Sequence, residues 1–164
     1  MPNPAGSLKP GEYEHRVTED SLDDDGYVLS IQTALTTVDG NVKKATATYY
    51  MPFGVNVMST EDPTAPGTYL SGVEVAIAHD GVRDVQLALA SARSTSIEVG
   101  DLLAVLATGQ VSHITDSPLY TAMGTIDTAK VILGLKGVVG VAEEAVLETV
   151  DPADGKIKCR LSIR

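Results

Sequence analysis

The sequence predicts a mainly β protein, a small β-barrel or sandwich of short antiparallel strands that follows an extended N-terminal arm. Runs rich in Val, Ile, Leu and Thr recur about every ten residues, with Gly, Asp or Pro turns between them. Residues 157–163 alternate strictly between apolar and polar positions, as a half-buried strand does. Patterns with a helical period are scarce.

The composition limits the kind of core that the chain can build. With 164 residues, a single domain is the default expectation. The chain has no Trp, one Phe and six Tyr, so its core must consist mainly of aliphatic side chains. Such cores suit strands and small barrels better than deep aromatic ligand pockets.

Residues 1–26 are expected to form the arm, and residues 27–164 the β-rich domain. The arm is rich in Pro, Gly and acidic residues, and the first 27 residues carry half of the net charge of -10. Two interpretations stay open: a tail without structure, or an arm that becomes ordered on a neighbouring subunit. The apolar anchors of such an arm would be Leu8, Tyr13, Val17 and Leu22.

Two Asp-Gly pairs predict hairpins. Asp39-Gly40 lies between the strand-like residues 27–38 and 42–51. Asp80-Gly81 interrupts residues 73–89, where an odd-length loop that places Ile77 opposite Val85 would keep one face apolar.

The remaining segments follow the same logic. The proline-rich residues 52–72 predict a long loop, which in a small β domain is a contact surface or mobile. Thr108-Gly109-Gln110 predicts a turn between strands at 97–107 and 111–115. Residues 116–128 fit either a loop or one helical turn, and residues 131–147 predict further strands.

The charge argues against two kinds of partner. A net charge of -10 disfavours binding to nucleic acid through phosphate neutralisation, and docking on anionic membranes. The sequence shows no signal-peptide pattern and no continuous apolar stretch of membrane-spanning length. We therefore expect a protein that is made in the host cytoplasm and used without export.

No catalytic, cofactor or metal site is expected. The chain lacks a G-x-S-x-G nucleophile elbow and a phosphate-binding glycine loop, and its three histidines are isolated in sequence. The single cysteine, Cys159, falls on the apolar face of the last strand and is expected to be a buried structural residue. Asp23-Asp24-Asp25 is expected to be a solvated charge run rather than a calcium site.

Four short motifs follow one another in the last third of the chain: VGDLLAV at 99–105, GQV at 109–111, VVGVAEEA at 138–145 and GKIKCRL at 155–161. In this order they resemble the small β-barrel structural proteins of tailed phages or related archaeal viruses. The likeness is to capsid decoration (cement) proteins and to the related family long mislabelled as a predicted recombinase. Residues 97–164 are therefore the barrel-like part that carries the resemblance.

The resemblance implies a non-enzymatic virion protein on the outer face of an icosahedral capsid. Its partners would be the major capsid protein and two further copies of itself in a homotrimer, an arrangement that gains avidity. Two alternatives stay open. One is another virion component, such as a minor capsid, head-fibre base or tail protein. The other is a β module that binds a small molecule or carbohydrate, although few aromatic residues are present for sugar stacking.

Under this interpretation the arm and the proline-rich loop would contact capsid or neighbouring subunits. The residues expected at these contacts are Leu8, Tyr13, Val17, Leu22, Tyr27, Pro52, Phe53, Pro63, Pro66 and Tyr69.

Overall fold

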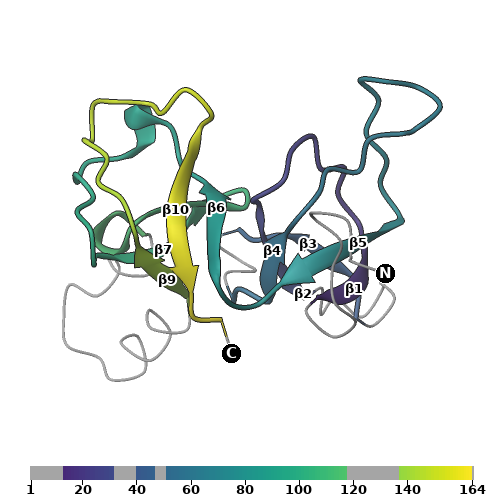
Figure 1. Cartoon of the computed structure of the whole chain (residues 1–164), viewed down its shortest axis with the longest axis horizontal. Helices are drawn as coiled ribbons and strands as arrows, with labels where there is room; N and C mark the ends of the chain where they lie inside the picture. Colours follow the sequence, from purple (N-terminus) through teal and green to yellow (C-terminus); the bar gives the residue numbers. More distant parts are fainter. Residues whose placement is uncertain (1–12, 32–39, 47–50, 118–136, 164) are drawn as a thin grey trace, which may run out of the picture.

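The computed structural model describes residues 13–31, 40–46, 51–117 and 137–163, and it confirms a mainly β protein. Figure 1 shows two groups of five strands side by side, one from each half of the chain. Two short 3₁₀ helices, η1 (Ala90–Ala92) and η2 (Ile114–Asp116), accompany the second group.

The first half forms a closed barrel with the strand order β1-β3-β2-β4-β5. Its interior is a small aliphatic cluster of Leu22, Leu29, Val42, Val75 and Ile77, as the shortage of aromatic residues requires. The strands are β1 (Glu14–Thr18), β2 (Val28–Ile31), β3 (Val42–Lys44), β4 (Gly54–Asn56) and β5 (Val73–Ala78).

The second half forms an antiparallel sheet with the order β6-β10-β9-β7-β8. Its two edges approach each other where Leu87, just after β6, forms a parallel bridge with Val111 of β8. The larger core cluster joins this sheet to the outer side of the barrel. The strands are β6 (Val82–Gln86), β7 (Leu102–Ala107), β8 (Gln110–His113), β9 (Val138–Ala142) and β10 (Lys156–Leu161).

The prediction of an extended N-terminal arm is wrong for residues 13–26, the part of it that the structure describes. Strand β1 pairs with β5 over five residue pairs and thereby closes the barrel. Leu22 is fully buried in the barrel core. The apolar period is missing because β1 is short and Val17 is the one apolar residue in it. Residues 1–12, including Leu8, lie outside the described residues.

The hairpin expected at Asp80-Gly81 is also wrong. Strand β5 pairs with β1 and β4, whereas β6 pairs with β10, so the turn joins two different sheets. The turn itself is confirmed, since Gly81 has a φ of 79°. Long-range partners compete for both strands, and a local turn signal cannot reveal them.

The other two predicted turns agree better with the structure. Strands β2 and β3 pair antiparallel, but Ile31 lies opposite Val42, so their connection is longer than the tight turn expected at Asp39-Gly40. The hairpin between β7 and β8 is confirmed. Its turn residues Thr108 and Gly109 have φ values of 45° and 76°, and positive φ at both positions is typical of a type I′ turn.

Strand β10 confirms the period-2 prediction. Ile157, Cys159 and Leu161 face the core while Lys158 and Arg160 are exposed. Burial raises the pKa of the Cys159 thiol to about 12, which suits a structural role and not that of a nucleophile. The closed barrel, however, lies in the first half of the chain and not in residues 97–164, which contribute four strands of the second sheet.

Gly140 allows β9 and β10 to approach closely. A Cβ built at this position would lie 2.1 Å from the carbonyl oxygen of Arg160 and 2.7 Å from Sγ of Cys159. No side chain larger than hydrogen fits there without separating the two strands. The glycine of the VVGVA motif is therefore required by packing.

The acidic run joins the two halves and is not simply solvated, which corrects the expectation. Asp24 and Asp25 both pair with the ammonium of Lys156 on β10, with a distance of 2.9 Å for Asp24. Gln86 at the end of β6 donates hydrogen bonds to the Asp24 carboxylate and the Asp25 carbonyl. Its backbone N–H donates to the carbonyl of Gly26 at 2.8 Å.

The ion pairs of Lys156 with Asp24 and Asp25 predict that the protein loses stability in acid. Burial disfavours the charged form of Asp24, but hydrogen bonds, chiefly from Lys156, outweigh it and hold the pKa below 3.8. The contribution of ionised Asp24 to folding stability is therefore complete above its pKa in the unfolded chain. It is lost as the pH falls through the lower pKa of Asp24 in the folded protein. We expect urea titrations to show a steeper fall in unfolding free energy below about pH 4 in the native protein than in Lys156→Met.

Lys158→Met is the control for this measurement, because Lys158 lies two residues further along β10 and is exposed. It should keep the native acid dependence. If Lys156→Met had the same acid dependence as the native protein, the carboxylate of Asp24 would not owe its lowered pKa to this lysine.

Candidate contact surface

Three of the residues expected at contacts are engaged within the molecule. The Tyr13 hydroxyl accepts a hydrogen bond from Arg83 at 2.8 Å. The Tyr27 hydroxyl donates to Asp23, and the Phe53 ring packs edge-on against His79. All three are half-buried and offer only part of their surface to a partner.

The expectation that Leu22 contacts a partner is wrong, because its side chain is fully buried. Val17, in contrast, is 37% exposed on β1. Pro52 is half-buried just before β4. The remaining three, Pro63, Pro66 and Tyr69, lie on one projection of the chain.

This projection, residues 58–70, is called the finger below and extends from the barrel at the upper right of Figure 1. Its base is fixed at Thr60, which is buried and exchanges hydrogen bonds with the backbone of Leu22. Glu61 and Tyr69 form a bridge between its two sides. Pro63 and Pro66 lie near its tip, and both are exposed. Gly67 directly follows Pro66.

The finger carries its own hydrogen bonds. The Asp62 carboxylate accepts from the backbone N–H and the hydroxyl of Thr64 at 2.8 and 2.7 Å. These two bonds hold the pKa of Asp62 below its usual value. Glu61 accepts from the Gly67 N–H at 2.8 Å, and Asp62 N–H donates to Thr68. The loop is therefore an ordered element that is already in one conformation before it meets a partner.

A second exposed element was missed by sequence reasoning. Leu147 and Val150 are 62% and 47% exposed in the segment between β9 and β10, called the apolar turn below (residues 146–150). Leu89, beside η1, is 60% exposed. The sequence around Leu147 predicts the end of a strand, and only the exposure of these aliphatic side chains identifies the segment as a surface element.

A buried arginine fixes the apolar turn. The Arg93 side chain is fully buried and donates hydrogen bonds to the carbonyls of Leu147, at 3.1 Å, and Val150. Asp151 lies 3.6 Å from the guanidinium and also accepts from the Ala90 N–H. On the other side, Ile97 pairs with Val146. The turn thus presents its aliphatic side chains on a rigid backbone.

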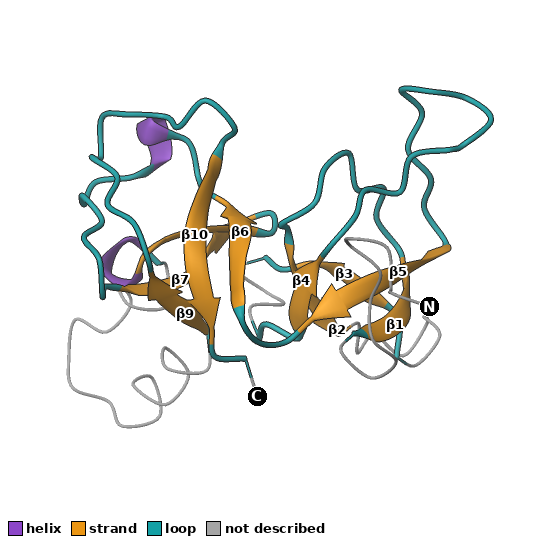
Figure 2. Ribbon diagram, viewed as in Figure 1, coloured by secondary structure: helices purple, strands orange, loops and turns teal. Residues whose placement is uncertain are grey.

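The finger and the apolar turn project to the same side of the molecule. In Figure 1, and in the same view in Figure 2, the finger lies at the upper right and the segment between β9 and β10 at the upper left. A partner surface could therefore contact both at once.

The polar clusters of the described residues serve structure. The Asp116 carboxylate accepts hydrogen bonds from Ser94, Ser112 and Thr95 at 2.6 to 3.0 Å. Burial raises its pKa, but these bonds outweigh burial and hold the pKa below 3.8. Asp116 thus stays an ionised acceptor that ties η2 to β8 and to the loop after η1, and it is a poor proton donor.

The histidines are paired with carboxylates. His79 lies between the Phe53 carbonyl, 2.6 Å from Nδ1, and the Glu14 carboxylate, 3.2 Å from Nε2. His15 lies 3.0 Å from Glu74. Within the described ranges no group of three or more His, Cys, Asp or Glu side chains is arranged to hold a metal ion.

No family model matches the chain, and no curated protein matches its sequence. Among the described residues, no helix is long and apolar enough to cross a membrane.

Proposed function

We propose that this protein is a structural component of a virion, a decoration protein that binds the outer surface of an icosahedral capsid and stabilises it. The observation that carries the proposal is the location of the four sequence motifs. They fall on β7 with its preceding turn, on the β7–β8 turn and β8, on β9, and on β10. These four strands are consecutive neighbours in one sheet.

The fold explains why two of the motifs contain glycine. Gly109 supplies the positive φ of the β7–β8 turn, and Gly140 permits the close approach of β9 and β10. The string that resembles decoration proteins is therefore one packed unit and not a chance series of turns. This supports the resemblance on which the proposal rests.

The exposed elements fit a role in adhesion. Internal hydrogen bonds hold the finger and the apolar turn in one conformation, so both need little ordering when they bind. We propose that they contact the major capsid protein and that the protein acts as a homotrimer. Three weak contacts held in one trimer bind far more tightly than one, because the second and third form at high effective concentration. No catalytic residue is needed for this role.

The test is co-sedimentation of the purified protein with shells of the virus that carries this chain. We expect saturation near one copy per major capsid subunit, and light scattering should give three times the 17.1 kDa of the chain. Saturation at a few copies per shell would instead indicate a minor capsid, head-fibre or tail component. Absence of binding would contradict the proposal and leave a ligand-binding β module as the alternative.

A shortened finger tests the contact surface. Replacing residues 62–68 by Asn-Gly keeps the bridge between Glu61 and Tyr69 and removes both prolines near the tip. We expect shell affinity to fall about 30-fold, as for the loss of a binding hot spot of about 2 kcal/mol. The control is Val82→Ser, which changes a 47% exposed aliphatic residue outside the finger and the apolar turn. Equal affinity of both variants would show that the finger does not bind the shell.

A further inference from the structure

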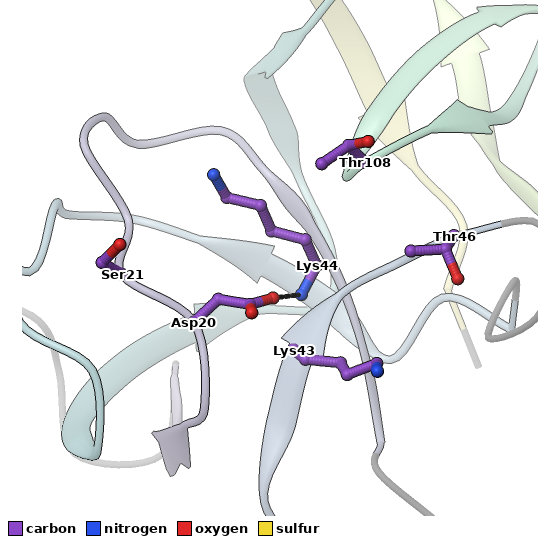
Figure 3. Close-up of a pocket in the computed structure, with 6 residues that line it drawn as sticks. All are labelled: Asp20, Ser21, Lys43, Lys44, Thr46 and Thr108. Atoms are coloured by element: carbon purple, nitrogen blue, oxygen red, sulfur yellow. Dashed lines mark hydrogen bonds between the residues drawn. The ribbon is translucent and has the colours of Figure 1, made fainter.

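A separate polar pocket lies where the tip of the β7–β8 hairpin meets the barrel (Figure 3). It has a volume of about 330 Å³ and is lined by Asp20, Ser21, Lys43, Lys44, Thr46 and Thr108. These residues come from three segments far apart in the sequence. The pocket is distinct from the finger and the apolar turn, and the proposed function does not use it.

The side chain of Lys44 extends into this pocket. Its side chain is only 17% exposed, and Figure 3 shows it reaching into the space between Ser21 and Thr108. Its Nζ lies 3.9 Å from the centre of the Tyr27 ring and 3.8 Å from the Asp23 carboxylate. The second distance is too long for a hydrogen bond. Among the residues that the structure describes, none accepts a hydrogen bond from this ammonium group.

The carboxylates nearby are already committed to other donors. Asp20 accepts the backbone N–H of Lys44 at 2.7 Å, and Asp23 accepts the Tyr27 hydroxyl at 2.7 Å. The hydrogen bond from Tyr27, together with nearby Lys44, holds the pKa of Asp23 below 3.8. Asp20 therefore fixes the pocket wall at Lys44, and Asp23 keeps its charge next to the Lys44 ammonium group.

Thr108 is held in a strained conformation at the rim. Its φ of 45° is in the left-handed region, and among the described residues it is the one non-glycine there. The hairpin tip is fixed by Gly109, which donates to the Ala45 carbonyl at 2.7 Å and accepts from the Val28 N–H at 2.8 Å. A β-branched residue in this region is unfavourable, and such strain is often retained for a function. This conformation places Thr108 at the rim of the pocket, on the side of Lys44 opposite Ser21.

We propose that this pocket binds an oxyanion, a carboxylate or phosphate group, on the Lys44 ammonium with the hydroxyls of Ser21 and Thr108 as further donors. A lysine is a compact positive charge with three donors, and hydroxyl groups can complete the shell of an anion. The group can come from a free anion or from an acidic side chain of a second copy of this chain. The chain's net charge of -10 makes such side chains abundant.

Amide NMR of the intact protein tests both sources. Titration with sodium phosphate and, separately, sodium acetate, at constant ionic strength, should move the amide signals of Ser21, Lys44 and Thr108 in a saturable manner if free anions bind. Dilution without added anion should move the same signals if a second copy fills the pocket. If neither series moves these signals, or if sodium chloride moves them equally, the proposal is wrong.

Two variants sharpen the test. Lys44→Gln should weaken anion binding at least tenfold, a typical effect of losing one charged hydrogen bond, whereas Lys158→Gln, at an exposed lysine elsewhere, should bind normally. Thr108→Gly should raise the thermal midpoint, because glycine tolerates positive φ, and yet bind the anion several-fold more weakly. A Thr108→Gly protein that is more stable and binds equally well would show that the strained hydroxyl is not part of a site.

Discussion

Gly140→Ala is expected to destabilise the protein more than a Gly→Ala substitution at any other described glycine of the second sheet. The new Cβ would lie 2.1 Å from a backbone oxygen of Arg160, and backbone cannot rotate away as a side chain can. Strands β9 and β10 must separate, which breaks the register of Leu161 opposite Gly140. We expect a loss of about 3 kcal/mol, the upper end for overpacking. Urea denaturation followed by circular dichroism measures it.

Gly67→Ala is the matched control for the added methyl group. Gly67 lies in the finger with a φ of 82°, and no atom beyond its two chain neighbours lies within 4 Å of the place that a Cβ would take, so only backbone strain opposes the change. It should cost about 1 kcal/mol. A Gly140→Ala protein no less stable than Gly67→Ala would contradict the close approach of β9 and β10.

The second large effect is expected from Arg93→Ala. The substitution removes a fully buried side chain and leaves the carbonyls of Leu147 and Val150 without their donor. Unsatisfied carbonyls and the cavity left behind should together cost about 3 kcal/mol. Because this arginine fixes the apolar turn, amide hydrogen exchange should also become faster at residues 146–150.

Two variants separate the contributions of the arginine. Arg93→Lys keeps the charge but lacks the planar fork that reaches both carbonyls, so an intermediate loss is expected. Asp151→Asn removes the charge of a half-exposed partner and should cost less than about 1 kcal/mol. Loss of stability in Asp151→Asn equal to that in Arg93→Ala would show that the ion pair, and not the carbonyl contacts, holds the turn.

The fold class could be predicted from the sequence, but the pairing of strands could not. Alternation identified β10, and turn residues located the β7–β8 hairpin, because both signals lie within a few neighbouring residues. The pairing of β1 with β5, and of β6 with β10, depends on residues more than fifty positions apart. Local patterns carry no information on such partners, so the predictions of the arm and of the Asp80-Gly81 hairpin are wrong.

The candidate surface could be predicted only in part. Three prolines and several turn-forming residues indicated a long loop and a contact surface, and the finger does project from the barrel. The apolar turn depends on burial of Arg93, and the Lys44 pocket depends on the meeting of a hairpin tip with β3. Both arise from tertiary contacts. The prediction for the acidic run failed because its partner, Lys156, lies near the other end of the chain.

The arrangement of the two strand groups along the chain has a consequence for synthesis. All strands of the barrel precede residue 79, and its internal cluster uses no described residue beyond Ile77. The barrel can therefore close on the ribosome while the second half is still being translated. Strand β6, in contrast, must wait for β10, about seventy residues later, with its apolar face exposed in the meantime. The finished barrel provides a surface on which this later half can assemble.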